Sequence, residues 1–173
     1  MISAWEVLGS KGDIRETILV LGAGLVGCET ADLLSETGRK VIIAEVLPEI
    51  APGQDGDTKA YFTLKFKKNG VEVLTGVELR SVEAEKAILQ RGSEELRVQV
   101  GTVVCAVGAE PDDELYKELA SSGLKVIPLT LPLFPANGGE GGVRGKVIKI
   151  GDCVQPRTIL EAVREGFQAG RWV

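Results

Sequence analysis

Histidine is absent from the 173-residue sequence. This absence removes the usual general base of enzymes and the usual nitrogen ligand of metal ions. No apolar run approaches the ~20 residues that span a bilayer, and no basic segment followed by an apolar stretch marks a secretory signal at the start. We therefore expect a cytoplasmic protein with no catalytic side chain, no metal site and no membrane partner, whose chemistry depends on a bound cofactor.

Paired cysteines and clustered basic residues are also missing. Cys28, Cys105 and Cys153 are far apart and form no Cys-x-x-Cys pair, so neither a metal site nor a redox disulfide is predicted. Packed, unreactive thiols are the simpler interpretation. The 20 basic and 25 acidic residues give a net charge of −5, and no stripe of Lys or Arg points to nucleic acid as a partner.

The hydrophobic pattern predicts strands and helices in alternation, interrupted by a run of short strands. A capping box at Ser3 and Glu6 also predicts a short helical turn. Strands are expected at 17–21, 40–44, 71–74, 77–82, 86–90, 96–100, 102–107 and 147–150. Helices are expected at 25–37, 58–68, 112–121 and 157–170, the second of them capped by Asp57.

This order of elements predicts an α/β fold, namely a Rossmann-like three-layer arrangement of a parallel sheet with an inserted three-stranded antiparallel meander. The expected organisation is a linker and short helix at 1–14, a nucleotide-binding domain at 15–128, a flexible loop at 129–145 and a final segment at 146–173. The loop is rich in Gly and Pro. It lacks the Lys-Ser/Thr ending and the preceding strand of a P-loop, so we interpret it as a connection and not as a phosphate cradle.

A glycine-rich turn between the first expected strand and helix carries the clearest functional signal. It consists of Gly22, Ala23, Gly24, Leu25, Val26 and Gly27, in Gly-x-Gly-x-x-Gly spacing. In such a motif Gly22 permits the tight turn, Gly24 lets the backbone approach a pyrophosphate, and Gly27 lets the helix pack against the strand. The N–H groups and the dipole at the helix start favour phosphate charge. The turn therefore predicts a bound dinucleotide.

Two acidic residues accompany this turn. Glu45 ends the second strand, and its carboxylate can accept hydrogen bonds from both ribose hydroxyls of an adenosine. A 2′-phosphate would be repelled there, and Val46 and its successors bring no Arg to neutralise it, so NADH is favoured over NADPH; the alternative is a merely solvated acid. Glu29 is expected in the first helical turn, where the helix dipole alone would explain it.

Nearly the whole chain resembles the C-terminal part of the NADH:flavin oxidoreductases of the 2,4-dienoyl-CoA reductase type. This family includes enoate reductases related to old yellow enzyme and to trimethylamine dehydrogenase. The resemblance rests on Ser3-Ala4-Trp5-Glu6-Val7-Leu8, Gly24-Leu25-Val26-Gly27-Cys28-Glu29-Thr30-Ala31, Val104-Cys105-Ala106-Val107-Gly108-Ala109-Glu110-Pro111 and Ile150-Gly151-Asp152-Cys153-Val154-Gln155-Pro156-Arg157, continued at 159–163 and 165–167.

The resemblance implies roles for individual residues. The pyrophosphate of NADH would lie on the glycine turn, with Glu29 near the nicotinamide carboxamide. The turn formed by Ala106, Val107 and Gly108 would pass beneath the dinucleotide. Asp152 would hydrogen-bond the ribityl chain of FAD, and the final helix would point its N-terminus at the flavin, where its dipole stabilises the reduced, anionic ring.

The complete enzymes of this family also carry a barrel domain with FMN and an iron–sulfur cluster, neither of which this chain would bind. The first half of the FAD domain has no counterpart in the sequence either. We therefore expect a fragment or small subunit that needs the missing FAD and barrel domains, and whose uncovered apolar surface could drive oligomers. Another FAD-dependent reductase, of the disulfide reductase or NADH oxidase type, and a non-enzymatic NADH sensor stay open as alternatives.

Purified alone, the chain should bind NADH but retain little FAD, because only Asp152 represents the flavin pocket. Absorbance of the purified protein near 450 nm, compared with calorimetric titrations of NADH and FAD, checks this expectation. A yellow protein with stoichiometric FAD would contradict it.

Overall fold

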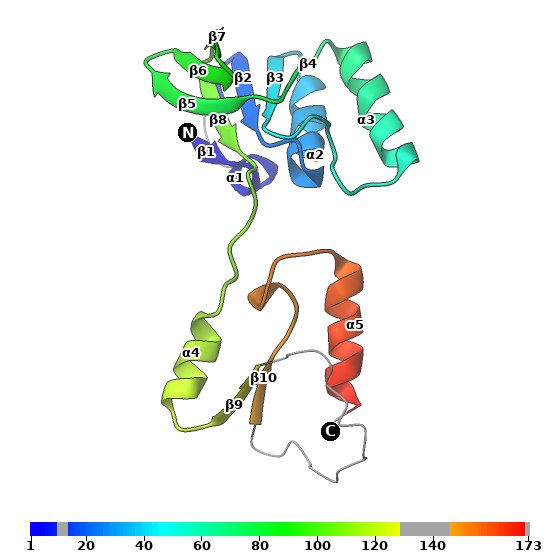
Figure 1. Cartoon of the computed structure of the whole chain (residues 1–173), viewed down its shortest axis with the longest axis vertical. Coiled ribbons are helices and arrows are strands. Elements are labelled where there is room, and N and C mark those ends of the chain that lie inside the picture. The colour runs from blue at the N-terminus through cyan, green and yellow to red at the C-terminus, as the bar shows by residue number, and fades with distance from the viewer. Residues whose placement is uncertain (10–13, 129–145, 172–173) are drawn as a thin grey trace. The chain divides into compact units, whose positions relative to one another are not determined.

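A parallel sheet organises residues 1–108, one of two compact units into which the chain divides; the other is 109–173. The computed structural model describes residues 1–9, 14–128 and 146–171. The strand order is β1-β8-β2-β3-β4, all parallel (Figure 1). The strands are β1 (Ile2–Ser3), β8 (Thr102–Cys105), β2 (Thr17–Leu21), β3 (Lys40–Glu45) and β4 (Glu72–Thr75). Because β8 returns to the other side of β2, the chain changes direction across the sheet between these two strands.

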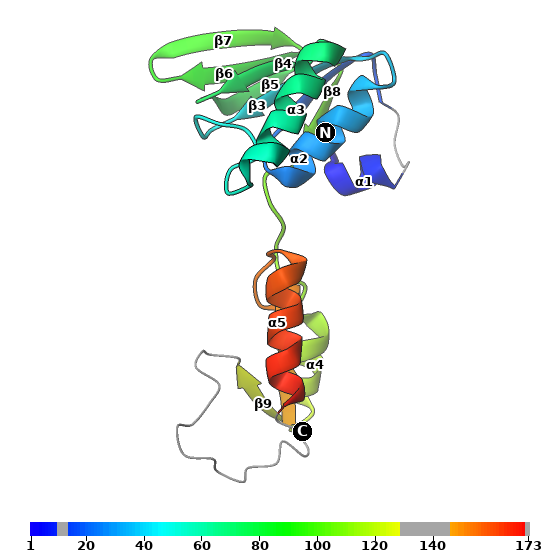
Figure 2. The same ribbon diagram turned by 90° about the vertical axis from the view of Figure 1, so that its right-hand side faces the viewer.

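Both faces of the sheet are covered along the central strands β2, β3 and β8, which explains why these strands are mostly apolar. In β2, Ile18 and Val20 pack under the helices, whereas Leu19 and Leu21 face the opposite layer. The helix layer consists of α1 (Ala4–Leu8), α2 (Leu25–Ser35) and α3 (Gly56–Asn69). The opposite layer is the antiparallel meander of β5 (Glu78–Glu83), β6 (Lys86–Arg91) and β7 (Glu94–Gln99) (Figure 2).

The three-layer fold predicted from the sequence is confirmed, and the element boundaries differ in small, explicable ways. The capping box of Ser3 and Glu6 is present. The predicted N-cap of α3 was wrong: Asp55, not Asp57, caps the helix, because its Oδ1 accepts from the backbone N–H groups of both Asp57 and Thr58 at 2.9 Å. In a sequence that reads Asp-Gly-Asp, spacing alone does not choose between the two acids.

The division of the chain differs from the expected one at two places. The segment expected as a linker contributes Ala4 and Val7 to the core, and β1 pairs with β8. Helix α4 (Glu114–Ser121) and β9 (Lys125–Pro128), which was not foreseen as a strand, belong to the second unit. The predicted flexible loop at 129–145 lies outside the described residues.

The second unit is organised around a parallel strand pair and one long helix. Strand β9 pairs with β10 (Lys146–Lys149), which leads into the turn η1 (Gly151–Cys153) and then helix α5 (Ile159–Gly170). Among its described side chains only Glu165 is buried. None of the described helices in either unit is both long and apolar enough to cross a membrane.

Candidate functional site

The glycine turn follows β2 at the carboxyl edge of the sheet, where the chain changes direction between β2 and β8. Gly22 has a φ of +92°, a conformation that L side chains rarely adopt. A Cβ on Gly22 would also come within 2.6 Å of the carbonyl oxygen of Ala106. The turns after β2 and β8 are therefore packed together, and in open α/β sheets this is the place where ligands bind.

The other two glycines of the motif have opposite surroundings. A Cβ on Gly27 would lie 1.9 Å from the carbonyl oxygen of Gly22, so only glycine lets α2 approach the turn. A Cβ on Gly24 would have no neighbour within 4 Å. Among the described residues no neighbour requires a glycine at position 24, whereas a ligand seated on the backbone there would.

Helix α2 begins at this open position without a side-chain cap. Its N-cap is Gly24, whose carbonyl accepts the first helical bond, from the N–H of Cys28 at 2.9 Å. The N–H groups of the first turn have no intrahelical acceptors, and the helix dipole adds partial positive charge to them. The helix start therefore has the chemistry of an anion site.

The side chain of Glu45 is hydrogen-bonded to the backbone of the glycine turn. Its side chain is 7% exposed, with Oε2 accepting from the N–H of Ala23 at 2.6 Å and Oε1 accepting from the N–H of Leu47 at 2.8 Å. No Lys or Arg of the described residues forms an ion pair with it. A carboxylate has about four acceptor positions, so hydroxyl donors can still bind Glu45 without displacing either backbone bond.

Cys28 is fully buried beneath the turn. Its thiol donates to the carbonyl oxygen of Ala23 over 3.3 Å. Burial raises the pKa of Cys28 to about 11, and a thiol that stays protonated is a poor nucleophile and metal ligand. Packing and hydrogen bonding therefore account for Cys28.

The remaining predicted contacts of the first unit fall into two groups. Val46, beside Glu45, is 64% exposed, and Val107, beyond β8, is 76% exposed; with Ala106 and Gly108 they lie at the same edge as the glycine turn. Glu29 is exposed, but it is the fifth residue of α2 and lies in the second turn, not in the first turn as predicted. The helix dipole falls off within the first turn, so it explains Glu29 less well than the sequence suggested.

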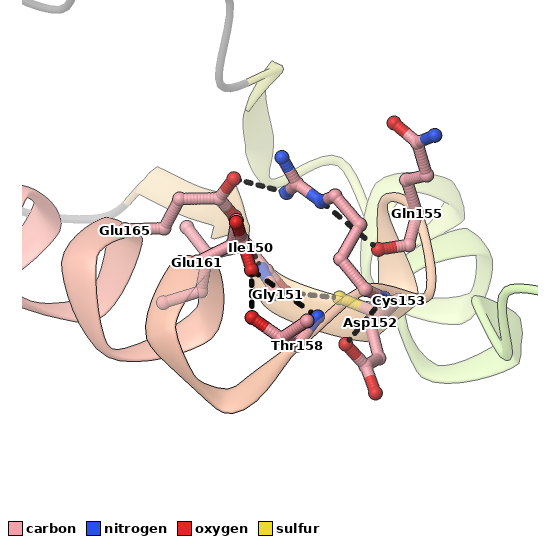
Figure 3. A network of polar contacts seen from close by, with 9 residues as sticks. Ile150, Gly151, Asp152, Cys153, Gln155, Thr158, Glu161 and Glu165 are labelled. Carbon is pink, nitrogen blue, oxygen red and sulfur yellow. Dashed lines mark hydrogen bonds and ion pairs between the residues drawn. The ribbon is translucent and has the colours of Figure 1, made fainter. Parts of the chain in front are cut away.

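Asp152 belongs to the second unit, where a polar network fixes its turn (Figure 3). Its Oδ1 accepts from the N–H of Arg157 at 3.3 Å. Glu165 accepts from the N–H of Gly151 at 2.7 Å and pairs with the guanidinium of Arg157. The N–H of Gly151 and then Arg157 lower the pKa of Glu165. The side chain of Asp152 itself is exposed.

Sequence reasoning missed the groups that support these turns. Two of these groups are the side chains of Cys28 and Glu165 described above. The third is the backbone N–H of Ala51, which donates to the carbonyl oxygen of Ala23 at 2.7 Å. Ala51 has a φ of +46° although it is not glycine. A backbone donor in an unusual conformation leaves no signature in residue type, so no sequence signal could have identified it.

Comparisons with known proteins identify the family of the chain. The family described as pyridine nucleotide-disulphide oxidoreductase matches residues 6–166. The NADH oxidase of Thermoanaerobacter brockii is 32% identical over 173 residues, 97% of this chain and 23% of that protein. The dihydrolipoyl dehydrogenase of Bacillus subtilis is 32% identical over 127 residues, 72% of this chain and 27% of that protein.

Among solved structures, a 2-naphthoyl-CoA reductase complex superimposes with a TM-score of 0.78 at 18% identity, over 99% of this chain and 23% of that one. At this identity the likeness concerns the fold alone. The chain thus spans about a quarter of the length of these relatives.

Alanine substitutions at two glycines should separate folding from binding. Gly27→Ala should lower the free energy of unfolding by about 3 kcal/mol or more, because its Cβ would overlap a backbone oxygen. Gly24→Ala should lower it by less than about 1 kcal/mol, the scale of an N-cap change, yet weaken NADH binding at least tenfold. Thermal unfolding and calorimetry measure the two effects. Equal losses of stability would refute the different surroundings described for the two glycines.

Glu165→Gln should loosen the turn that carries Asp152. The variant loses the charge that attracts Arg157, so the amide proton of Gly151 should exchange with solvent at least tenfold faster. In the native chain the same bond should weaken in acid. Because the pKa of Glu165 is lowered on folding, its contribution is complete above the pKa of an unfolded glutamate, about 4.3, and is lost as the pH falls through the folded value. Glu118→Gln, at an exposed position of α4, is the matched control.

Proposed function

The chain belongs to the pyridine nucleotide-disulphide oxidoreductase family, and from this premise we propose that its first unit binds NADH and positions the nicotinamide for hydride transfer to FAD in a larger flavin-dependent oxidoreductase. One observation carries the proposal. The turn at Gly24 is open, uncapped and rich in N–H donors, and it lies at the edge of the sheet where α/β folds bind nucleotides.

The proposed contacts follow from the charges at this edge. The diphosphate lies on the backbone of residues 22–27, where N–H donors and the helix dipole offset its negative charge. Glu45 accepts from the ribose hydroxyls of the adenosine, and its anionic, buried carboxylate disfavours a 2′-phosphate. Val46, exposed beside Glu45, contributes an apolar surface to the same half of the ligand.

We assign the nicotinamide half of NADH to the other side of the position where the chain changes direction, between β2 and β8. The turn of Ala106, Val107 and Gly108 runs beside Gly22 and supports the dinucleotide from below. Glu29 contacts the carboxamide. When bound, NADH supplies the hydride itself, so this chain contributes orientation and not proton transfer, in keeping with a sequence without histidine.

More specifically, we propose that the complete enzyme is a cytoplasmic NADH:flavin oxidoreductase of the 2,4-dienoyl-CoA reductase type. Its FMN and iron–sulfur cluster would lie in domains outside this chain. The segment 150–157 supports it, because it carries the most specific part of the resemblance. Asp152 is then the contribution of this chain to the FAD site, consistent with its exposed position in a turn held by Glu165 and Arg157.

The exposed surface of α5 supports a larger enzyme as well. Along this helix four apolar side chains are 62–83% exposed. They are Ile159, Leu160, Val163 and Phe167. Contiguous exposed apolar surface marks a site of interaction, and we assign this one to the rest of the FAD domain. The same surface would favour dimers of the isolated chain.

Two other functions remain as alternatives within this proposal. An FAD-dependent reductase of the NADH oxidase or disulfide reductase type is favoured by the 32% identity to the NADH oxidase and to the dihydrolipoyl dehydrogenase. A non-enzymatic NADH sensor would have no use for the Asp152 turn. Supplying the flavin-bearing domains and following NADH-dependent bleaching of the flavin near 450 nm separates the enzymes from the sensor.

Substitution of Glu45 tests the nucleotide assignment. Glu45→Ala should raise the dissociation constant for NADH at least tenfold, because it removes the ribose acceptor and the support of the Ala23 N–H. Glu45→Arg should also bring the affinity for NADPH above that for NADH, since its guanidinium can pair with the 2′-phosphate. Parallel calorimetric titrations with both nucleotides give the ratio.

Glu72→Ala is the control, because it removes the same charge at the amino end of β4. It should leave both affinities within twofold of the native values. An unchanged NADH/NADPH ratio in Glu45→Arg would rule out the role assigned to Glu45. A native chain without measurable NADH affinity would overturn the proposed function itself.

A further inference from the structure

The carbonyl oxygen of Ala23 receives two hydrogen bonds from groups outside the glycine turn. The backbone N–H of Ala51 donates at 2.7 Å and the thiol of Cys28 at 3.3 Å. Ala51 and Cys28 are both fully buried. The carbonyl of Ala23 is thereby held toward the protein interior.

The direction of this carbonyl fixes the direction of the next N–H group. The peptide bond joining Ala23 to Gly24 is planar and trans, so its C=O and N–H point in opposite directions. When the oxygen of Ala23 points into the core, the N–H of Gly24 must point out of it. The surroundings of Gly24 are open on the side where a side chain would stand. The donor is therefore aimed before any ligand arrives.

Ala51 occupies an uncommon conformation in order to make its bond. Its φ is +46° and its side chain is completely buried in the core beneath the helices. Non-glycine residues rarely adopt this region, and such strain persists only where the surroundings determine it. Here the carbonyl of Ala51 accepts from the N–H of Gln54 at 3.1 Å, and Asp55 directly beyond caps α3. The loop after β3 is thus fixed directly after its contact with the glycine turn.

We propose that Ala51, assisted by Cys28, is a positioning residue that aims the N–H of Gly24 at the diphosphate of the dinucleotide. This inference rests on the proposed function for the identity of the ligand. The geometric part, the coupling of Ala51 to the direction of the Gly24 amide, does not depend on the ligand and can be measured without it.

Substitutions at Ala51 in the full chain test the proposal. Valine is β-branched and disfavours a positive φ, so Ala51→Val should move the loop, release the carbonyl of Ala23 and raise the dissociation constant for NADH at least tenfold. In the absence of NADH, the ¹⁵N–¹H resonance of Gly24 should shift or broaden. Ala51→Gly keeps the N–H in an allowed conformation and should restore both the native resonance and the native affinity.

Ala84→Val is the matched control, because Ala84 is the other non-glycine residue with positive φ, +50°, among the described residues and lies in an exposed turn of the meander. It should change neither the Gly24 resonance nor the affinity. A folded Ala51→Val variant with a native Gly24 resonance and an affinity within twofold of the native value would overturn the inference.

If circular dichroism shows that Ala51→Val does not fold, two variants of Cys28 test the same coupling. Cys28→Ala removes the thiol donor and should shift the Gly24 resonance and weaken NADH binding about threefold. Cys28→Ser keeps a donor and should bind like the native chain. If the alanine and serine variants are indistinguishable in both measurements, the inference fails. A native chain that does not bind NADH at all, but whose Gly24 resonance responds as described, would refute the proposed function and leave the coupling standing.

Discussion

A buried carboxylate bound to a backbone amide is the contact on which the nucleotide edge of the fold depends. Glu45 has no cationic partner among the described residues, and its charge is stabilised by the N–H groups of Ala23 and Leu47. Burying an anion is unfavourable unless hydrogen bonds replace its water. These bonds hold the end of β3 to the end of β2. They also place a negative charge beside a helix start that attracts anions. On the proposed function, one site then favours a diphosphate and disfavours an additional phosphate nearby.

The backbone groups of Ala23 are all paired on the interior side of the turn. Around Ala23 the N–H is bound by a side chain and the carbonyl by Ala51 and Cys28, so the groups that face the interior are all satisfied. An unpaired buried N–H or C=O would destabilise the turn by about 1–3 kcal/mol. Since these groups are paired, the donors that remain are the N–H groups of the first turn of α2, which have no intrahelical acceptors. The turn thus leaves free N–H groups for a ligand because the backbone groups of Ala23 are paired within the protein.

The sequence predicted those features that depend on side-chain type at a fixed spacing. Strand β2 was predicted at its observed bounds because a strand buried on both faces must be apolar throughout. Spacing gave Gly22 and Gly27 structural roles and Glu45 a role toward the ligand, and the structure brings the three residues together. Two-residue β1 was missed because its pairing with β8 is a long-range contact without local pattern. Ala51 was missed because its contribution is a backbone donor, which any residue type could have supplied.

The two units are stabilised by different interactions: buried apolar clusters in the first unit, and polar contacts in the described part of the second. The first unit buries two apolar clusters, one on each face of its sheet, so its glycine turn is supported by a complete core. The described part of the second unit buries only Glu165, while the apolar face of α5 is exposed. Its turn at Asp152 therefore relies on charged and polar contacts, chiefly those of Glu165 with the N–H of Gly151 and with Arg157. Covering α5 with further protein would remove water from its apolar face, which lies opposite Glu165 on the helix. On the proposed function, the NADH site is thus complete within this chain, whereas the contribution of Asp152 to the flavin site is completed by the domain that packs against α5.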